Sequence, residues 1–295
     1  MTHKSLRCFV WVFLLLTGCG PVGCLRAQTA PSRKIFVITD LEGVNNIFDF
    51  DLQCIPDKSP RYRESQQLLT GEVNAAVQGL LAGGATQLVV YDGHYGGHNI
   101  LPFKLNPKAR LLAGTPVSPT LGLDDSYSAL VFIGLHSMAG TRRGILPHSF
   151  TWDVENIWVN GRKVGEIGAR VMLAGEYGIP AIMLSGDTAA CNEYHDLVPQ
   201  GECAPVKSGV SHTAGFTLSP SAADELIREK AQLAMQRLPA IKPYHLASPV
   251  EVKVEYIPSA TARFLPGPDV QQLGGDTWVF RGKNLVDAWL RFRSF

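Results

Sequence analysis

Hydrophobic residues along this chain form four short continuous runs, at residues 35–40, 87–92, 129–134 and 180–187. Each run is apolar at successive positions, which is typical of a strand covered on both faces of a parallel sheet. Stretches with helical periodicity lie between the runs, at residues 63–82 and 166–177. This alternation predicts an α/β fold with a mostly parallel sheet and helices on both of its faces.

The pattern changes in the last part of the chain. After a predicted helix at residues 221–237, "VEVKVEYI" alternates strictly between apolar and polar positions, and "TWVFRG" and a closing helix "NLVDAWLRFR" follow it. Alternation is typical of a sheet with one solvated face. We therefore expect an α/β domain over residues 33–240 and a small C-terminal α+β lobe over residues 241–295.

A second local signal lies in the middle of the chain. The pair Asn160-Gly161 stands between two short apolar runs in "NIWVNGRKVG". Asn-Gly in that setting is the strongest short-range indication of a β-hairpin. We expect a two-stranded ribbon directly before the helix that begins near residue 166.

The first 32 residues differ in composition from the rest. A short basic start is followed by an apolar stretch from Cys8 to Leu16, which is too short to span a bilayer and predicts a secretory signal. "LTGC" resembles a bacterial lipobox, in which Cys19 would be lipidated, whereas Ala27 offers an ordinary cleavage point. We expect an exported protein, either periplasmic or anchored in the membrane as a lipoprotein, and both processing routes stay open.

Three cysteines follow this segment: Cys54, Cys191 and Cys203. None has the paired spacing of a zinc knuckle. In an oxidising compartment Cys191 and Cys203 can pair, which would leave Cys54 as a lone thiol. The alternative is three separate buried thiols.

The charge balance limits the kinds of binding partner that we expect. The chain has 27 basic and 26 acidic residues, a net charge of +1, and no basic run with interleaved aromatic residues. Such a protein has no long-range field to attract a polyanion. We therefore expect no nucleic-acid partner.

Acidic and imidazole side chains stand at or just after the ends of the four predicted strands. The carboxyl ends of parallel strands meet at one edge of a sheet, so these residues can converge on a single crevice. Mixed carboxylate and imidazole ligands suit zinc or another divalent first-row metal. Taken singly, such an Asp is more often a helix cap and such a His a structural residue, but the group favours a metal site. The residues are Asp40, Glu42, Asp92, His94, His136 and Asp187.

The other histidines are less clearly placed. His98 has i, i+4 spacing to His94, but Gly96 and Gly97 make a helix there unfavourable, so we expect His98 in a loop or pocket. His148 lies in a glycine-containing loop, "GILPHSF". No G-x-S-x-G elbow and no Walker-type phosphate loop is found, which excludes two common hydrolase designs. We assign no role to His195, His212 and His245.

Five motifs occur in a fixed order: "TDLEGV", "YDGHYGGHNI", "GLHSMAG", "GILPHSF" and "VNGRKVGEIG". Together with "SGD" and "APVKSG" they resemble the zinc-dependent D-aminopeptidases of peptidase family M55. The resemblance implies a two-zinc centre, a catalytic His148, a ring-shaped homo-oligomer, and short peptide substrates with D-residues at the N-terminus. The implied metal ligands are Asp40, Glu42, His94, His136 and Glu166.

Two other functions use the same ligands. An exported metal- or peptide-binding protein would capture a solute, but it has no use for a further histidine beside the metals. A metal-dependent phosphoesterase would need basic contacts near the metals, and only Arg142 and Arg143 qualify. A metal-dependent aminopeptidase is the function that the sequence favours.

Overall fold

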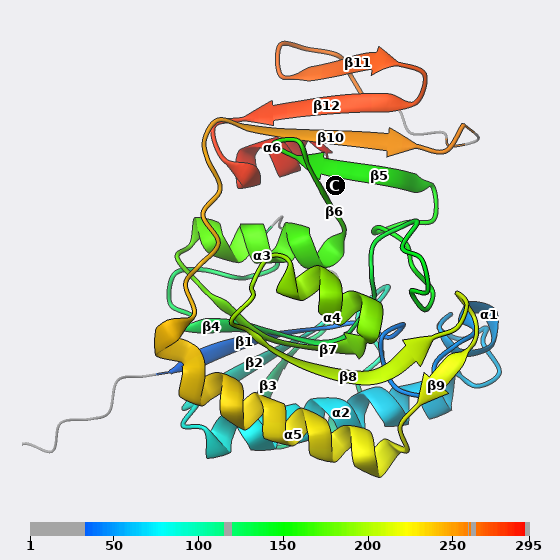
Figure 1. Ribbon diagram of the computed structural model, residues 1–295, viewed down its shortest axis with the longest axis vertical. Coiled ribbons are helices and arrows are strands. Elements are labelled where there is room, and N and C mark those ends of the chain that lie inside the picture. The colour runs from blue at the N-terminus through cyan, green and yellow to red at the C-terminus, as the bar shows by residue number, and fades with distance from the viewer. Residues whose placement is uncertain (1–32, 115–119, 259, 261–263, 293–295) are drawn as a thin grey trace, which may run out of the picture. The chain divides into compact units, whose positions relative to one another are not determined.

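Seven strands form the main sheet, in the order β3-β2-β1-β4-β7-β8-β9 (Figure 1). The computed structural model describes residues 33–114, 120–258, 260 and 264–292, which belong to one compact unit, Ser32–Phe295. Neighbouring strands are parallel except for β8 and β9. The strands are β1 (Lys34–Thr39), β2 (Gln87–Asp92), β3 (Ala109–Leu112), β4 (Ala129–Leu135), β7 (Ala181–Asp187), β8 (Glu202–Gly209) and β9 (Gly215–Thr217).

The four predicted apolar runs are the central strands β1, β2, β4 and β7, so the predicted α/β fold is confirmed. Figure 1 shows α2 and α5 on one face of the sheet and α3 and α4 on the other. Strands β4 and β7 are buried at every position, as two covered faces require. The helices are α1 (Phe50–Gln53), α2 (Tyr62–Ala82), α3 (Glu166–Glu176), α4 (Thr188–His195), α5 (Pro220–Arg237) and α6 (Leu285–Phe292), with 3₁₀ turns at Pro102–Lys104 and Leu238–Ala240.

A second, antiparallel sheet lies beyond α3 and α6 in Figure 1, in the order β11-β12-β10-β5-β6. The alternating segment forms β10, in which every second residue is buried. The predicted hairpin is also present, with Asn160 (φ 47°) and Gly161 (φ 80°) in the turn between β5 and β6. The strands are β5 (Val154–Val159), β6 (Arg162–Val164), β10 (Val250–Tyr256), β11 (Val270–Gly274) and β12 (Thr277–Gly282).

The β5–β6 hairpin belongs to the same sheet as the C-terminal strands. Strand β5 pairs with β10 over Val252↔Val159 to Tyr256↔Val154, so residues from both sides of the expected boundary at 240 and 241 share one sheet. The buried residues of this sheet pack with Trp289 and Phe292 of α6. The division into two domains stays a prediction. The C-terminal strands share their sheet with the β5–β6 hairpin, which comes before the predicted boundary.

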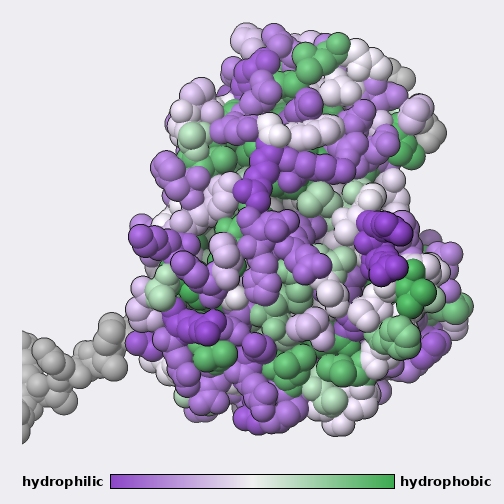
Figure 2. Space-filling model, viewed as in Figure 1, coloured by the Kyte–Doolittle hydropathy of each residue, from purple (hydrophilic) through white to green (hydrophobic). Residues whose placement is uncertain are grey.

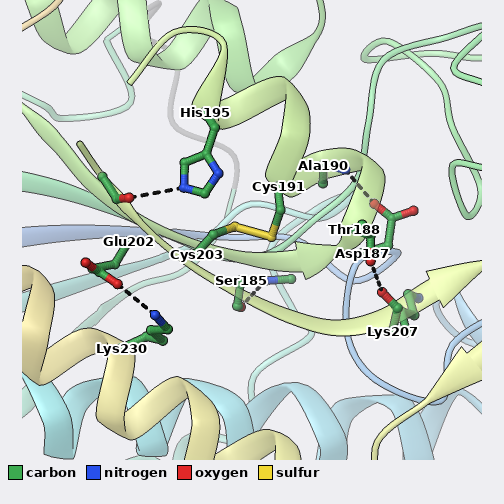
Figure 3. The surroundings of a disulfide bond; sticks show 12 residues. Ser185, Asp187, Thr188, Ala190, Cys191, His195, Glu202, Cys203, Lys207 and Lys230 are labelled. Atoms are coloured by element: carbon green, nitrogen blue, oxygen red, sulfur yellow. Dashed lines mark hydrogen bonds and ion pairs between the residues drawn. A yellow bond between two sulfur atoms is a disulfide. The ribbon is translucent and has the colours of Figure 1, made fainter. Parts of the chain in front are cut away.

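One disulfide joins α4 to β8. Cys191 and Cys203 are bonded, with their Cα atoms 5.8 Å apart, and Figure 3 shows the bond between the helix and the strand. Cys54 is a free, buried thiol. The pairing predicted for an oxidising compartment is therefore present, rather than three separate thiols.

The predicted export segment, with Cys19 and Ala27, lies outside the described residues. Among the helices that the structure describes, none is both long enough and apolar enough to cross a membrane.

Candidate metal centre

The order of strands in the main sheet reverses between β1 and β4. From β1 the chain continues to β2 and β3 on one side, and then returns to β4 on the other. In open parallel sheets, sites form in the crevice outside the strand ends at such a point. The register places Thr39 beside both Asp92 and Ile133, so the segments that follow these three strands begin side by side.

Two glycines allow the loop after β1 to lie directly against the end of β4. The amides of Asp40 and Gly43 donate to Ile133 O (2.9 Å) and Gly134 O (2.8 Å). A Cβ on Gly43 would lie 2.0 Å from Leu135 O, and one on Gly134 would lie 2.3 Å from Asp40 O. Gly134 also has a φ of 75°, which other residues rarely adopt. Larger residues at these positions would push Asp40 away from β4.

The first group of possible ligands consists of Asp40, Glu42 and His94, whose ligand atoms all lie within 4.8 Å of one another. His94 Nδ1 is 3.1 Å from Asp40 Oδ1 and 3.1 Å from Glu42 Oε2. All three side chains are buried. Strand β1 supplies both acids from the loop at its end, and the loop after β2 supplies the imidazole.

The second group consists of His136, His148 and Glu166, again within 4.8 Å of one another. His136 Nε2 is 3.5 Å from Glu166 Oε1 and 3.4 Å from Asp40 Oδ2. Glu166 is the first residue of α3, and its Oε1 accepts a hydrogen bond from Phe150 N (2.8 Å). The two oxygens of Asp40 thus face one group each, and this carboxylate links them.

In each of the three imidazoles, one ring N–H donates a hydrogen bond to a backbone carbonyl. A carbonyl oxygen only accepts, so that nitrogen carries the proton, and in the neutral ring the other nitrogen directs a lone pair toward the carboxylates. Donation of this kind is how metal-binding histidines are usually oriented. The bonds are His94 Nε2 to Cys54 O (2.8 Å), His136 Nδ1 to Ser137 O (3.0 Å) and His148 Nδ1 to Leu146 O (2.9 Å).

Two buried atoms in this region test whether a cation fits. Among the described residues, neither Glu42 Oε2 nor His136 Nε2 has a hydrogen-bond partner of regular geometry, and their near neighbours are the imidazole and carboxylate groups given above. Burying a carboxylate oxygen or a ring nitrogen without a partner is unfavourable. A divalent cation would satisfy both kinds of atom and would offset the repulsion among the carboxylates. The donor set therefore fits metal ions.

The position of His148 is ambiguous by distance alone, because its Nε2 lies near the second group and 3.9 Å from Glu42 Oε1. Its ring is stacked on that of His136, with centroids 4.0 Å apart and planes 11° apart. An imidazole binds a metal through the lone pair in its ring plane, at about 2.0–2.1 Å. Two parallel planes at a contact distance of ~3.5–4.0 Å share no such position. The stack therefore disfavours one ion shared by His136 and His148.

The electrostatics of the site follow from burial and the close acids. Burial by itself would raise the pKa of Asp40, but the close imidazoles of His136 and His94 outweigh it and hold the pKa well below its usual range. Burial would lower the pKa of both imidazoles, yet the neighbouring carboxylates raise it well above the ordinary value. A metal ion competes with these protons for the same lone pairs.

Two buried charged residues support the site from behind. Lys207 Nζ donates to Glu42 O (2.6 Å) and Ile47 O (2.5 Å), and burial lowers its pKa to about 8. Glu193 Oε2 accepts from Met138 N (2.8 Å), two residues after His136, and burial raises the pKa of Glu193 to about 7. Neither residue was singled out from the sequence, because their role depends on backbone contacts that no motif records.

Two of the strand-end acids have other roles. Asp92 accepts hydrogen bonds from Asn99 N (2.7 Å) and Ile100 N (2.8 Å) and belongs to neither group. Asp187 caps α4 through Ala190 N (2.7 Å) and also accepts from Ile145 N (2.6 Å). Both are structural, as single strand-end acids usually are.

Two other histidines that the structure describes, His98 and His195, belong to neither group. The His98 side chain lines a different cavity, beside Phe103. His195 Nε2 bonds to Gly201 O (3.1 Å), as Figure 3 shows.

A cavity of about 280 Å³ opens over the two groups. Its floor includes the carboxylates of Asp40, Glu42 and Glu166, and its walls include Phe50 and Trp152, which the sequence analysis did not identify. Clustered carboxylates and imidazoles at a switch point, open to a small cavity, define a metal-dependent hydrolase.

The sequence profile of the family Peptidase_M55, described as D-aminopeptidase, matches residues 33–294, and the chain belongs to this family. A D-aminopeptidase from Bacillus subtilis (strain 168) is 31% identical over 262 residues, covering 87% of this chain and 94% of that protein. The solved structure of the Zn-dependent D-aminopeptidase DppA from B. subtilis, described as a self-compartmentalizing protease, has a TM-score of 0.80. It is 28% identical and covers 88% of this chain and 95% of its own.

Proposed function

We propose that the protein is a zinc-dependent aminopeptidase that removes N-terminal residues, D-residues in particular, from short peptides. One zinc ion would be held by Asp40, Glu42 and His94, and a second by Asp40, His136 and Glu166. The observation that carries the proposal is the placement of Asp40, whose two oxygens face His94 (3.1 Å) and His136 (3.4 Å) in separate groups. The B. subtilis relatives, described as D-aminopeptidases, support the activity and the metal.

When bound, the zinc ions would polarise the scissile carbonyl and make an attacking water more acidic. His148 is the group that moves the proton. Its Nδ1 is committed to Leu146 O, so Nε2 accepts a proton from the water and passes it to the amide nitrogen as the C–N bond breaks. Trp152 stacks on the other side of this ring, with centroids 4.5 Å apart, and fixes its plane.

The alternative functions fit the cavity less well. Among the described residues that line it there is no Arg or Lys, which a phosphoesterase needs for its phosphate. Arg142 lines a different cavity, beside Arg162 and Lys163. A binding protein would need no proton-transfer group beside the metals. Hydrolysis of a peptide is the chemistry that the arrangement favours.

The test compares two neighbouring histidines. His148→Ala should leave the metal content near that of the wild type and lower kcat by about 10²–10⁴, the range for a lost acid–base group. His136→Ala should lose metal and activity together. Metal content is measured on purified protein, and kcat on D- and L-aminoacyl peptides.

Two results would contradict this assignment of roles. If His148→Ala lost a metal ion and regained normal kcat when saturated with zinc, His148 would be a ligand. If it kept full activity on every peptide, the mechanism would be wrong.

We also propose that the chain forms a homo-oligomer. The related DppA is described as self-compartmentalizing. On the face seen in Figure 2, hydrophobic residues gather at the right, over the β8–β9 hairpin and α1. Exposed apolar side chains in these segments are Leu52, Val210, Phe216 and Leu218. A mass measurement in solution that gives a monomer at all concentrations would contradict the proposal.

Export is part of the same proposal. A disulfide such as Cys191–Cys203 persists in oxidising compartments and is rare in the cytosol, so it supports an exported protein. The mass of the mature protein distinguishes a lipidated Cys19 from cleavage near Ala27. An unprocessed N-terminus would contradict both routes.

A further inference from the structure

Three aromatic residues from separate segments surround the mouth of the cavity over the metal centre. Phe50 begins α1, Tyr95 follows His94, and Trp152 lies in the loop before β5. The Phe50 ring is the common neighbour, with centroids 5.2 Å from Trp152 and 6.2 Å from Tyr95. We call these three residues the aromatic rim. None of them offers a metal ligand of the two groups, and the chemistry proposed above needs only the stacking of Trp152.

Two residues of the rim are exposed and Phe50 is partly buried, whereas the floor is buried. Trp152 is 51% exposed and Tyr95 is 55% exposed, whereas Glu42 at the floor is 1% exposed. Large apolar side chains that remain half-exposed around a polar pocket are typical of a ligand contact. Tyr95 is also held in the left-handed region, with a φ of 46°, a conformation that costs free energy.

The depth of the two layers determines which part of a peptide each would contact. This step rests on the proposed function. An aminopeptidase takes the N-terminal residue to the floor, because the bond that breaks lies directly after it. The following residue then lies at the level of the mouth. Trp152 stacks on the ring of His148. In the proposed mechanism, Nε2 of His148 protonates the leaving nitrogen of that second residue, so Trp152 lies next to it.

We propose that the aromatic rim binds the side chain of the residue after the scissile bond and selects peptides in which that residue is large and apolar or aromatic. Aromatic rings offer a large apolar area and favourable edge and face contacts to such a side chain. A small second residue leaves Tyr95 and Trp152 in water and gains none of this. The first residue is not selected by the rim.

The experiment uses the full-length, zinc-loaded protein and two peptide series. One series keeps the first residue and varies the second through Ala, Leu and Phe, and the other varies the first and keeps the second. In the wild type, kcat/KM for a second-residue Phe should exceed that for Ala by about 10- to 100-fold, as hydrophobic pockets usually discriminate.

The variants separate binding from catalysis. Tyr95→Ala and Trp152→Ala should each lower the Phe-to-Ala ratio by about 10-fold, without changing the order of the first-residue series. In Tyr95→Ala the change should come through KM, whereas Trp152→Ala should also lower kcat for every peptide alike, because Trp152 stacks on His148. Trp152→Phe keeps an aromatic ring against His148, so its losses in kcat and in the ratio should both be smaller than those of Trp152→Ala. Phe103→Ala, a fully exposed aromatic residue at a different cavity, is the matched control and should change nothing.

Three outcomes overturn the inference. Equal kcat/KM values across the second-residue series in the wild type would do so, as would an unchanged ratio in both Tyr95→Ala and Trp152→Ala. If the rim variants changed only the order of the first-residue series, the rim would contact the first residue of the peptide rather than the second. If the zinc-loaded wild type hydrolyses no peptide of either series, the proposed function fails and this inference fails with it.

Discussion

The metal centre has two halves that the fold builds in different ways. The sheet half consists of Asp40, Glu42, His94 and His136, which follow the parallel strands β1, β2 and β4. The hairpin half consists of His148 and Glu166, which stand on either side of the β5–β6 hairpin. Parallel strands fix the first half by their own hydrogen-bonded register. The second half has no such template.

The hairpin half depends on distant parts of the chain. Strand β5 is paired with β10, almost a hundred residues later, along Val252↔Val159 and the pairs that follow. The ring of Phe150, two residues after His148, lies 5.4 Å from that of Trp289 in α6. The second sheet therefore holds His148, the proposed proton-transfer residue, and Glu166, a proposed metal ligand, over the crevice of the first. The comparison shows that the small C-terminal strands contribute to the site although they supply no site residue.

Removing Asp40, which links the two groups of possible ligands, should have the largest effect. Asp40→Asn should lose both metal ions and lower kcat/KM by at least about 10³-fold, because its two oxygens face one group each. Glu42→Ala should lose the ion proposed for Asp40, Glu42 and His94, and Glu166→Ala should lose the ion proposed for Asp40, His136 and Glu166. Metal analysis after dialysis against a weak chelator measures this.

The matched control is Asp92→Asn, which changes another acid at a strand end. Within the described part of the chain, Asp92 accepts hydrogen bonds from backbone amides and the Asn99 side chain and belongs to neither ligand group, so this variant should lose stability and keep its metal. A single ion lost from Asp40→Asn would show that the two groups are independent.

The two halves also differ in how far the sequence predicts them. The expectation that ligands follow the ends of parallel strands identified every residue of the sheet half, because a continuously apolar run reveals a parallel strand and its end. It also selected Asp92 and Asp187, since an acid that caps backbone amides has the same position in sequence as a ligand. Glu166 was found only through the family resemblance. Its place depends on the pairing of β5 with β10, which local patterns do not contain.

Other parts of the fold escaped prediction for similar reasons. Strand β8 contains Pro205 and the charged Lys207, which interrupt an apolar run, but Lys207 is buried because it donates to the loop after β1. The aromatic rim brings Phe50, Tyr95 and Trp152 together from three separate segments, and no spacing in the sequence records that contact.

The disulfide connects α4 and β8, the two elements that carry the supporting residues Glu193 and Lys207. Cys191 lies on α4 two residues before Glu193, and Cys203 lies on β8 four residues before Lys207 (Figure 3). Replacing both cysteines by Ala should lower the free energy of unfolding by about 2–4 kcal/mol, the usual effect of opening a short loop. Neither cysteine touches the metal groups, so kcat and metal content should stay near the wild type. Chemical denaturation and metal analysis check both parts, and a large loss of metal would show that the disulfide positions the ligands.

The smallest effect is expected from Glu193, which supports the hairpin half. Its carboxylate accepts from Met138 N and interacts with Gly165 N, the residue before Glu166, so it ties together the segments that carry His136 and Glu166. Glu193→Ala should weaken the binding of one zinc ion by about 10- to 100-fold, as is usual when the residues that orient metal ligands are lost.

A graded pair of variants and a control make this test specific. Glu193→Gln keeps one oxygen that can accept from Met138 N, so its defect should be smaller than that of Glu193→Ala. Glu202→Gln is the control, because Glu202 is also buried but pairs with Lys230 and Arg237 rather than with the segments of the site. It should lower stability without changing zinc affinity. If both positions weakened zinc equally, the loss at Glu193 would reflect general destabilisation, and the hairpin half would need no support from α4.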